Sequence, residues 1–263
     1  MNRHRRGWHR LCLALVALAA APAAPAAPAA APLVAAASDL RFALDEVAAK
    51  FARDTGDTVR IVYGSSGNFR HQIAEGAPFE LFLSADEALV LALAKEGRTV
   101  DEGVLYAVGR IVLVVPEGSP LKPDPRLQDL ALAVADGRVR KFAIANPEHA
   151  PYGRAAQEAL TATGAWDAIR PRLVFGENVA QAAQFALSGS AQGGIVALSL
   201  ALAPGVLGTA RHAVIPEGMH RPLLQRMVLT KRAGATARAF YAYLQQPAAR
   251  AVLKRYGFAL PGE

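Results

Sequence analysis

The feature that most constrains the fold is an alternation of extended apolar runs with segments of helical periodicity, and this alternation starts twice. The first series begins with LVAAA at 33–37, and the second begins with KFAIA at 141–145. In each series, an extended run is followed by apolar residues at helical spacing, and several of these segments end at a glycine. Strand–helix alternation of this kind is typical of parallel sheets covered by helices on both faces.

The two series predict two α/β lobes joined by two chain crossings, near 110–116 and near 216–223. We expect the first lobe to comprise 30–113 and 222–263, and the second lobe to comprise 114–221. Ligands of such sheets bind beyond the carboxyl ends of the strands, and a cleft between lobes is a favoured pocket. The expected strands are 33–37, 58–63, 79–84, 110–116, 141–145, 172–175, 193–200, 213–216 and 223–230, and the expected helices are 39–52, 69–73, 85–96, 154–163, 180–187 and two within 235–256.

Residues 1–29 have the composition of a secretory signal peptide. The first ten positions contain four arginines and no acidic residue, and they are followed by the apolar run LCLALVALAA and the small-residue repeat APAAPAAPAA. The apolar run is too short to remain as a membrane span. We therefore expect cleavage near 26–29 and a periplasmic location, with a retained N-terminal anchor as the alternative.

Removal of this segment would change both the charge and the cysteine content. The chain has 29 Lys+Arg against 22 Asp+Glu, and loss of the four N-terminal arginines would leave 25 basic against 22 acidic residues. A balance this mild, spread along the chain, does not indicate nucleic-acid binding. The single cysteine, Cys12, lies in the apolar run, so the mature chain would use neither thiols nor disulfides.

Polar residues recur where an expected strand passes into an expected helix. Ser38 in AAASDL and Ser66 in YGSSGN hold this place in the first series, and Tyr152 in HAPYGR and Asn178 in GENVAQ hold it in the second. Serine and asparagine at helix starts are usually caps. The free N–H groups and the dipole of a helix N-terminus also favour anions. Two such turns from each lobe predict an exported, two-lobed anion-binding protein.

At these residues the sequence resembles the periplasmic molybdate-binding proteins of ABC transporters. The resemblance is carried, in the family's order, by AAASDL, YGSSGNFRHQIAEGAPFELFLSAD, ANPEHAPYGRAAQEAL, TGAWD, GENVAQA, GGIVALS and YAYLQQPAARAVLKRYGF. It implies a type II periplasmic-binding-protein fold, in which two hinged α/β lobes close on one tetrahedral oxyanion. The sequence is similar to the branch of the family that has a tyrosine after the PEHAP motif.

The resemblance also implies the residues that bind the oxyanion. Ser38 and Ser66 would each donate through the hydroxyl and the backbone N–H. Asp39 would add its backbone N–H. From the second lobe, Tyr152 and the backbone N–H of Val179 would complete the site.

The site implied in this way consists of neutral donors and contains no Arg, Lys or His, which suits a dianion that carries no proton. The carboxylate of Asp39 would repel an anion, so we expect its side chain to point away or to cap the helix. Ala197 stands where another branch has a tyrosine after GIV, so Tyr152 would replace that donor. The glycines of YGSSGN would let the backbone approach the ligand, and Ser65 would be structural.

The function implied by the resemblance is capture of molybdate or tungstate in the periplasm and delivery to an inner-membrane ABC permease through transient contact. Such a receptor would be a monomer, would not be an enzyme and would need no cofactor, because the oxyanion is its cargo. Two alternatives remain open: a receptor for another tetrahedral oxyanion such as sulfate or phosphate, and a secreted hydrolase. A hydrolase would use G-x-S-x-G, and GSSGN departs from it at the last position. His149 has no metal-ligand partner at suitable spacing, and we expect Asp86 to cap a helix.

Overall fold

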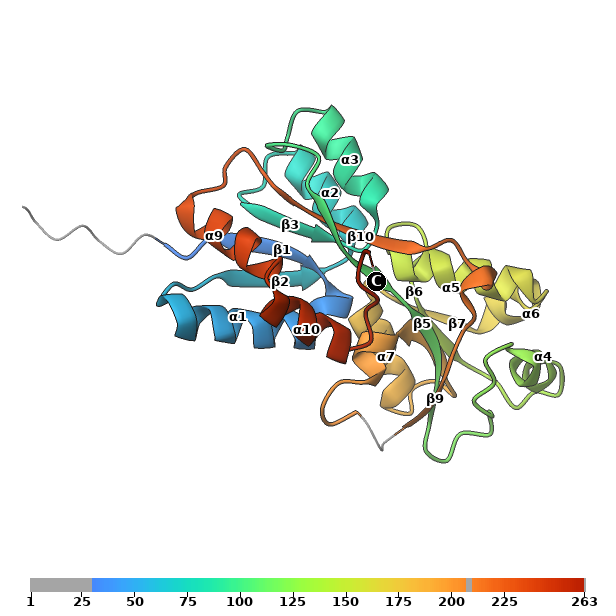
Figure 1. Cartoon of the computed structure of the whole chain (residues 1–263). Helices are drawn as coiled ribbons and strands as arrows, with labels where there is room; N and C mark the ends of the chain where they lie inside the picture. Colours follow the sequence, from blue (N-terminus) through green and yellow to red (C-terminus); the bar gives the residue numbers. More distant parts are fainter. Residues whose placement is uncertain (1–29, 207–209, 263) are drawn as a thin grey trace, which may run out of the picture. The chain divides into compact units, whose positions relative to one another are not determined.

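Two five-stranded sheets organise the part of the chain that the computed structural model describes, residues 30–206 and 210–262. The predicted signal peptide at 1–29 lies outside the described residues. Each sheet is the centre of an α/β lobe, and both lobes belong to one compact unit, Ala31–Glu263 (Figure 1). We call them the first lobe and the second lobe in the order in which the chain begins them.

The first sheet has the strand order β2-β1-β3-β10-β4. Strands β1, β2 and β3 (Leu33–Ala37, Arg60–Gly64 and Leu81–Ser84) are parallel and come from the first strand–helix units. Strand β10 (Leu223–Leu229) runs antiparallel between β3 and β4 (Val104–Gly109). The first lobe therefore takes its sheet from both ends of the described chain.

Helices cover both faces of the first sheet, as the period-two alternation of side chains along β1 requires. Val34 and Ala36 contribute to a core shared with α1, α9 and α10, whereas Ala35 contributes to a core shared with α2 and α3 (Figure 1). The bounds of these helices are α1 Arg41–Thr55, α2 Ser66–Ala74, α3 Glu87–Lys95, α9 Ala235–Leu244 and α10 Pro247–Arg255, and a 3-10 turn, η1, spans Ser38–Leu40 before α1.

The second sheet has the strand order β7-β6-β8-β5-β9, with β6 parallel to β7 and β8, and β5 antiparallel to β8 and β9. Its strands are β5 Ile111–Pro116, β6 Phe142–Ala145, β7 Leu173–Gly176, β8 Gly194–Ala197 and β9 Ala210–Val214. Its helical segments are α4 Gln128–Ala135, α5 Pro151–Ala162, α6 Trp166–Ile169, η2 Arg170–Arg172, α7 Val179–Leu187, α8 Leu198–Ala201 and η3 Glu217–Met219.

Both sheets are mixed, which corrects the expectation of parallel sheets. The antiparallel strands are β5 and β10, the two strands that the chain enters just after passing from one sheet to the other. The parallel strands that lead into the helices at Ser38 and Ser66 finish at the edge where the lobes meet. A chain that has just crossed therefore enters the next sheet from that edge and runs in the opposite direction.

Several elements differ from the expected ones in their bounds or in the sheet to which they belong. The boundary expected at 113/114 falls inside β5, all of which pairs in the second sheet, so the sheets change between Gly109 and Ile111. The strand expected over 193–200 ends at Ala197, and the short helix α8 takes the remainder. The patterns above predict neither β4 nor α4.

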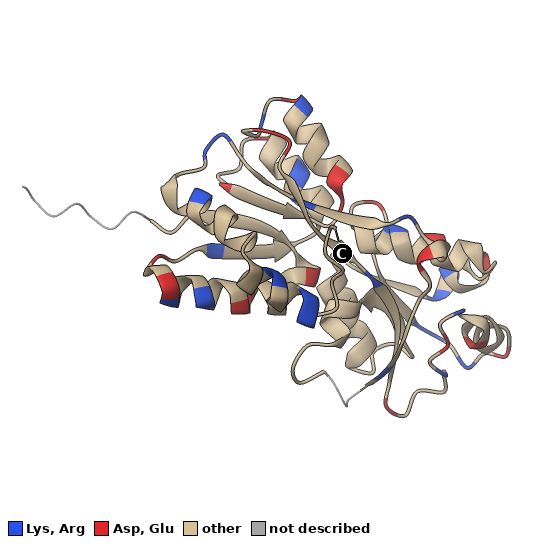
Figure 2. Ribbon diagram, viewed as in Figure 1, with Lys and Arg blue, Asp and Glu red and all other residues tan. Residues whose placement is uncertain are grey.

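Charged residues are interspersed over the surface of the described residues. In Figure 2, basic and acidic residues alternate along helices of both lobes rather than collecting on one face. This distribution agrees with the absence of a nucleic-acid signature in the sequence. Between residues 30 and 262, with 207–209 left aside, no helix combines the length and apolar character needed to cross a membrane.

An aromatic cluster formed by Phe51 of α1 with two rings of α9 gives a test of the first lobe's core. The ring of Phe51 lies 5.1 Å from that of Phe240 and 5.3 Å from that of Tyr243, both edge to face, and the side chain of Phe51 is 1 % exposed. We expect Phe51→Ala to lower the free energy of unfolding by about 3–5 kcal/mol, because it leaves a cavity. Chemical denaturation measures this change. Phe42→Ala, on the same helix but at a 36 % exposed position, is the control and should lose far less; equal losses would contradict the core assignment.

Candidate oxyanion site between the lobes

Five segments that end strands or begin helices meet at one small cavity between the lobes. The first lobe contributes the ends of β1, β2 and β3, and the second lobe contributes the starts of α5 and α7. The cavity volume open to the centre of a water molecule is about 10 Å³, roughly the room that one water needs. Its lining residues are Ala37, Ser38, Asp39, Gly64, Ser65, Ser66, Ala85, Ala150, Pro151, Tyr152 and Val179.

All five residues that the sequence predicts for the site line this cavity. Ser38, Asp39 and Ser66 reach it from the first lobe, and Tyr152 and Val179 reach it from the second. Each is at most 3 % exposed. The structure therefore brings the five predicted positions together, although they lie as far apart in the sequence as 38 and 179.

Local sequence fixes where each helix begins at the cavity. Pro151 occupies the first turn of α5, where its missing N–H removes no helical bond. Asn178 is the N-cap of α7, and its side-chain oxygen accepts from the N–H groups of Ala180 and Gln181, each at 3.1 Å. Ser65 precedes α2 in an extended conformation. In each case the helix begins at a residue that lines the cavity.

The hydroxyl oxygens of Ser38 and Ser66 each accept a hydrogen bond from a backbone N–H. The N–H of Ala180 lies 3.2 Å from Ser38 Oγ, and the N–H of Ala85 lies 3.0 Å from Ser66 Oγ. A hydroxyl has one proton to donate. These contacts occupy acceptor positions of the two oxygens, so both hydroxyl protons are free to be donated toward a group in the cavity.

Backbone N–H groups add further donors at the start of α5. The first N–H of this region bonded to the helix's own backbone is that of Arg154, which donates to Ala150 O at 3.1 Å. The N–H groups of Tyr152 and Gly153 precede it and belong to the orphan donors of a helix N-terminus. In α7, the N–H of Val179 is an orphan donor of the same kind. It precedes the N–H of Ala182, which donates to Asn178 O.

The side chain of Asp39 behaves differently from the expectation. It caps no helix; it is buried between the lobes, where Oδ2 accepts from Tyr152 Oη at 2.9 Å and from Gln225 Nε2 at 2.6 Å. The other oxygen, Oδ1, is buried without a hydrogen-bond partner among the residues described. Burial raises the pKa of Asp39 to about 6. The short range of sequence patterns explains the error, since Gln225 lies 186 positions away.

The hydroxyl of Tyr152 likewise donates its hydrogen bond to a residue of the protein. Its single proton points to Asp39 Oδ2, so in this arrangement the phenol does not replace the donor missing at Ala197. Burial raises the pKa values of Tyr152 and Tyr106 well above the usual range, and the nearby carboxylate of Asp39 raises both further. Tyr106 donates to Gln225 Oε1 at 2.7 Å and thereby orients the amide toward Asp39.

Direct contacts at the turn Ser65–Gly67 bind the two lobes. Ser65 Oγ donates to the carbonyl oxygen of His149 at 2.6 Å and lies 2.9 Å from His149 Nδ1. The N–H of Gly67 donates to the same carbonyl at 3.0 Å. Ser65 thus has the structural role expected of it, and His149 orders a loop. Gly67 allows the close approach of His149 rather than of a ligand, because a Cβ there would lie 2.4 Å from His149 O.

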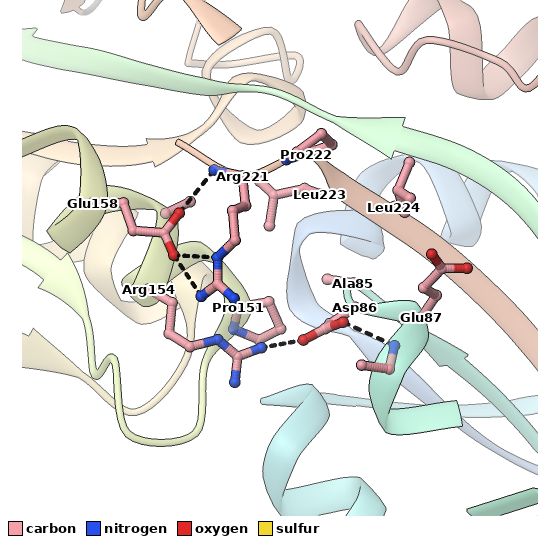
Figure 3. Close-up of a pocket in the computed structure, with 12 residues that line it drawn as sticks. Ala85, Asp86, Glu87, Pro151, Arg154, Glu158, Arg221, Pro222, Leu223 and Leu224 are labelled. Carbon is pink, nitrogen blue, oxygen red and sulfur yellow. Dashed lines mark hydrogen bonds and ion pairs between the residues drawn. The ribbon is translucent and has the colours of Figure 1, made fainter. Parts of the chain in front are cut away.

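A charged groove of about 350 Å³ adjoins the cavity and shares Ala85 and Pro151 with it. Figure 3 shows Arg154 of the second lobe paired with Asp86 of the first lobe across this groove, and Arg221 paired with Glu158. Asp86 also caps α3 by accepting from the N–H of Ala88 at 2.9 Å, as the sequence predicts. The arginines and acidic residues of this groove therefore lie outside the cavity and pair with one another.

Gly109 supports this network from the point where the chain changes sheets. A Cβ at Gly109 would lie 2.3 Å from Tyr152 Oη and 2.9 Å from Gln225 Nε2. The residue after it, Arg110, pairs with Glu217 at 2.7 Å. Backbone at the crossing is thus packed directly against the phenol that donates to Asp39.

Four residues that shape the site are not indicated by the sequence patterns. Ser199 donates to the backbone oxygen of Asp39 at 2.7 Å, and the N–H of Ala85 holds Ser66. Gln225 and Tyr106 complete the buried network. Gln225 and Arg226 interrupt the apolar strand β10, and this polar pair is the signal that could have pointed to Gln225. In the described part of the chain, no three His, Cys, Asp or Glu residues gather as a metal site.

Comparison with known proteins places this fold in a family. The pattern of the bacterial extracellular solute-binding protein family matches residues 32–259. The molybdate-binding protein ModA of Azotobacter vinelandii is 38 % identical over 230 residues, covering 86 % of this chain and 89 % of that protein, and ModA of Rhodobacter capsulatus is 36 % identical over 229 residues, covering 86 % and 87 %. The solved structure of the Azotobacter vinelandii periplasmic molybdate-binding protein superimposes with a TM-score of 0.80 at 32 % identity, covering 88 % of this chain and 99 % of that one.

Two α/β lobes that enclose a cavity lined by neutral donors define a ligand-binding protein of the periplasmic type. The chain belongs to the bacterial extracellular solute-binding protein family. Its fold is the expected two-lobed one, and the relatives that carry the resemblance are solute-binding proteins rather than enzymes.

The raised pKa of Asp39 predicts how stability depends on pH. The carboxyl binds its proton with a pKa of about 6 in the folded protein, against an ordinary value of 3.8. The folded state therefore holds more protons than the unfolded state between these values, and this contribution to stability is lost as pH rises through them. At about 1.4 kcal/mol per pKa unit, the loss is on the order of 3 kcal/mol. We expect Asp39→Asn to gain stability over the parent chain by about this amount between pH 4 and pH 7, as measured by urea denaturation. Asp57→Asn is the control at an exposed position. A stability difference between Asp39→Asn and the parent chain that does not change with pH would contradict the prediction.

Proposed function

We propose that this protein binds molybdate in the cavity between its lobes and delivers it to the membrane permease of an ABC transporter. The observation that carries the proposal is the state of the two serine hydroxyls. Both oxygens accept a backbone N–H, from Ala180 and Ala85, so both protons can be donated into a cavity that also receives two helix N-termini. Such a site matches an anion that only accepts hydrogen bonds.

The ligand-binding residues that we propose are Ser38, Asp39, Ser66, Tyr152 and Val179. Ser38 and Ser66 would donate through hydroxyl and N–H groups, and the other three through backbone N–H groups. Hydrogen bonds to a charged partner contribute about 1.5–3 kcal/mol each. Several of them, made in a cavity that excludes bulk water, can offset the loss of an oxyanion's hydration shell.

The relatives' names support the choice of ligand. The two relatives described above are molybdate-binding proteins, and this chain is similar to them over most of its length. We propose that tungstate, with the same charge and geometry, is also bound, and that the oxyanion is cargo with no further cofactor. We also propose that the protein is not an enzyme.

The proposed setting is the periplasm. A signal peptide at 1–29 would direct export and be removed, and the mature receptor would act as a monomer that contacts its permease transiently. Closure of two lobes about a pair of crossings is the usual motion of such receptors. In this chain the crossings lie at Arg110 and between Val214 and Leu223.

Removal of both serine hydroxyls tests the proposed ligand contacts. We expect the double variant Ser38→Ala, Ser66→Ala to bind molybdate roughly 10²–10⁴-fold more weakly, since two hydrogen bonds to a charged ligand are lost. Calorimetric titration of the dialysed protein with molybdate, tungstate, sulfate and phosphate measures this effect and the selectivity together. Ser190→Ala, at an exposed serine bonded to Ser188, is the matched control. Unchanged affinity in the double variant would refute the site, and a preference for sulfate or phosphate would refute the choice of ligand.

The close approach of Gly67 to His149 gives a second test, which concerns closure rather than ligand contact. A Cβ at 67 would meet backbone atoms of His149 at 2.4–3.1 Å, so the lobes of Gly67→Ala must stay farther apart. We expect molybdate affinity to fall at least about tenfold (about 1.4 kcal/mol), while the thermal midpoint of the ligand-free protein changes little. Gly218→Ala is the control, because nothing lies within 4 Å of its Cβ position. Parent-like affinity in Gly67→Ala would show that the lobes bind ligand without this contact.

A further inference from the structure

One carboxyl oxygen of a residue that lines the cavity lacks a hydrogen-bond partner. Among the described residues, three buried side-chain polar atoms have no hydrogen-bond partner: Asp39 Oδ1, Arg110 Nε and His220 Nε2. Only Asp39 lines the cavity in which the proposed ligand would lie. Its side chain is 1 % exposed, so bulk water does not satisfy the free oxygen in this arrangement. A buried acceptor of this kind needs a donor or a proton.

The other carboxyl oxygen fixes how Asp39 is held. Oδ2 receives two donors, Tyr152 Oη at 2.9 Å and Gln225 Nε2 at 2.6 Å, one from each lobe. Tyr106 fixes the amide of Gln225 through its oxygen, and the same amide nitrogen also donates to Tyr152 Oη at 3.1 Å. Oδ1 is therefore the side-chain atom of Asp39 left to interact with a ligand.

We propose that one proton enters the cavity together with the oxyanion and is held between Asp39 Oδ1 and a ligand oxygen. This inference rests on the proposed function and deepens it. In this complex the carboxyl becomes a hydrogen-bond donor to the anion, like the serine hydroxyls and backbone N–H groups around it. No bond to the central atom of the oxyanion forms or breaks, and the proton comes from the solvent.

The reason is electrostatic. A dianion and a carboxylate side by side in a buried site repel each other, and nearby negative charge raises the pKa of a carboxyl. Two acceptor oxygens that face each other cannot form a hydrogen bond until one of them is protonated. The pKa of Asp39 is already raised by burial before any anion is present, so uptake of the proton at neutral pH requires only a further shift in the same direction.

Besides Tyr152 and Gln225, the backbone N–H groups of Asp39 and Leu40 favour the ionised carboxyl, but burial outweighs all of them. The titratable groups that act on it are Tyr152 of α5 and Tyr106 of β4, and both stay neutral because their pKa values lie well above the usual range. Helices α7 and α8 carry no charged residue. The remaining charged residues on the packed elements are exposed or paired elsewhere: Arg41, Asp45, Glu46, Lys50, Arg53, Asp54, Arg60, Arg110, Arg154, Glu158 and Arg226.

The source of the proton distinguishes classes of oxyanion. Molybdate, tungstate and sulfate are fully ionised dianions at neutral pH, so the proton must be taken from the solvent. Hydrogen phosphate carries its own proton and could donate it to the ionised Oδ1. The two cases share one bound geometry but differ in the number of protons exchanged with the buffer.

Calorimetry at pH 8 in two buffers of different ionisation enthalpy counts these protons. The titrations use molybdate with the parent chain, with Asp39→Asn and with the exposed control Asp57→Asn. In Asp39→Asn, the amide oxygen can accept from Tyr152 and Gln225 while the NH₂ group replaces the protonated Oδ1. We expect uptake of about one proton per molybdate by the parent and by Asp57→Asn, and about zero by Asp39→Asn.

The pH profile of affinity gives an independent readout. Above the pKa of the free carboxyl, the Kd of the parent should rise about tenfold per pH unit, whereas the slope for Asp39→Asn should be near zero. Tight molybdate binding by the parent without proton uptake and with a flat profile would overturn this inference but leave the proposed function intact. Parent-like proton uptake in Asp39→Asn would overturn it as well. If no oxyanion bound to any variant, the proposed function would fail and this inference with it.

Discussion

The arrangement of the site depends on bringing helix N-termini from two lobes together around one enclosed space. Helix N-termini carry partial positive charge, so the starts of η1, α2, α5 and α7 would repel one another if nothing negative lay between them. In this structure the negative group is the carboxylate of Asp39, held by one donor from each lobe. The same residue therefore helps the lobes to meet and becomes the group that an incoming anion must neutralise.

Much of the fold could be predicted from the sequence because hydrophobic periodicity is local. Strand β1 and helices α7, α9 and α10 lie where apolar spacing, glycines and caps indicate. The direction of β5 and β10 could not be predicted in this way, because it depends on which sheet the chain has just left. Strand β4 lacked a signal of its own, since its side chains are only partly buried at Val104, Leu105 and Val108.

The same distinction holds at the site. Helix starts pointed to Ser38, Ser66 and Tyr152, because a polar residue after a strand is a local pattern, whereas Asp39 and Val179 were implied by the resemblance. The roles of the Asp39 and Tyr152 side chains could not be predicted, since each is set by a partner more than a hundred positions away. Distance in the chain, rather than a weak pattern, limits what the sequence shows here.

Charge is distributed so that Asp39 is the one ionisable carboxyl among the residues that line the cavity, while the ion pairs lie around it. The pairs Arg154–Asp86 and Arg226–Glu87 lie on partly exposed positions beside the groove, where ion pairs contribute about 0–1 kcal/mol. Of the two, only Arg154–Asp86 joins the lobes, because Arg226 of β10 and Glu87 of α3 both belong to the first lobe. An arginine or lysine inside the cavity would change the preference for a dianion, whereas an ion pair outside the cavity leaves that preference unchanged.

The contact beneath Tyr152 limits how this protein could be made more rigid. Replacing a glycine by alanine is a common way to stabilise a protein, because it reduces the freedom of the unfolded chain. At Gly109 that route is closed, since the added methyl group would occupy the place of the phenolic oxygen. Gly109 therefore leaves room at the crossing for the phenol that donates to Asp39, and stabilising substitutions must be sought elsewhere in the lobes.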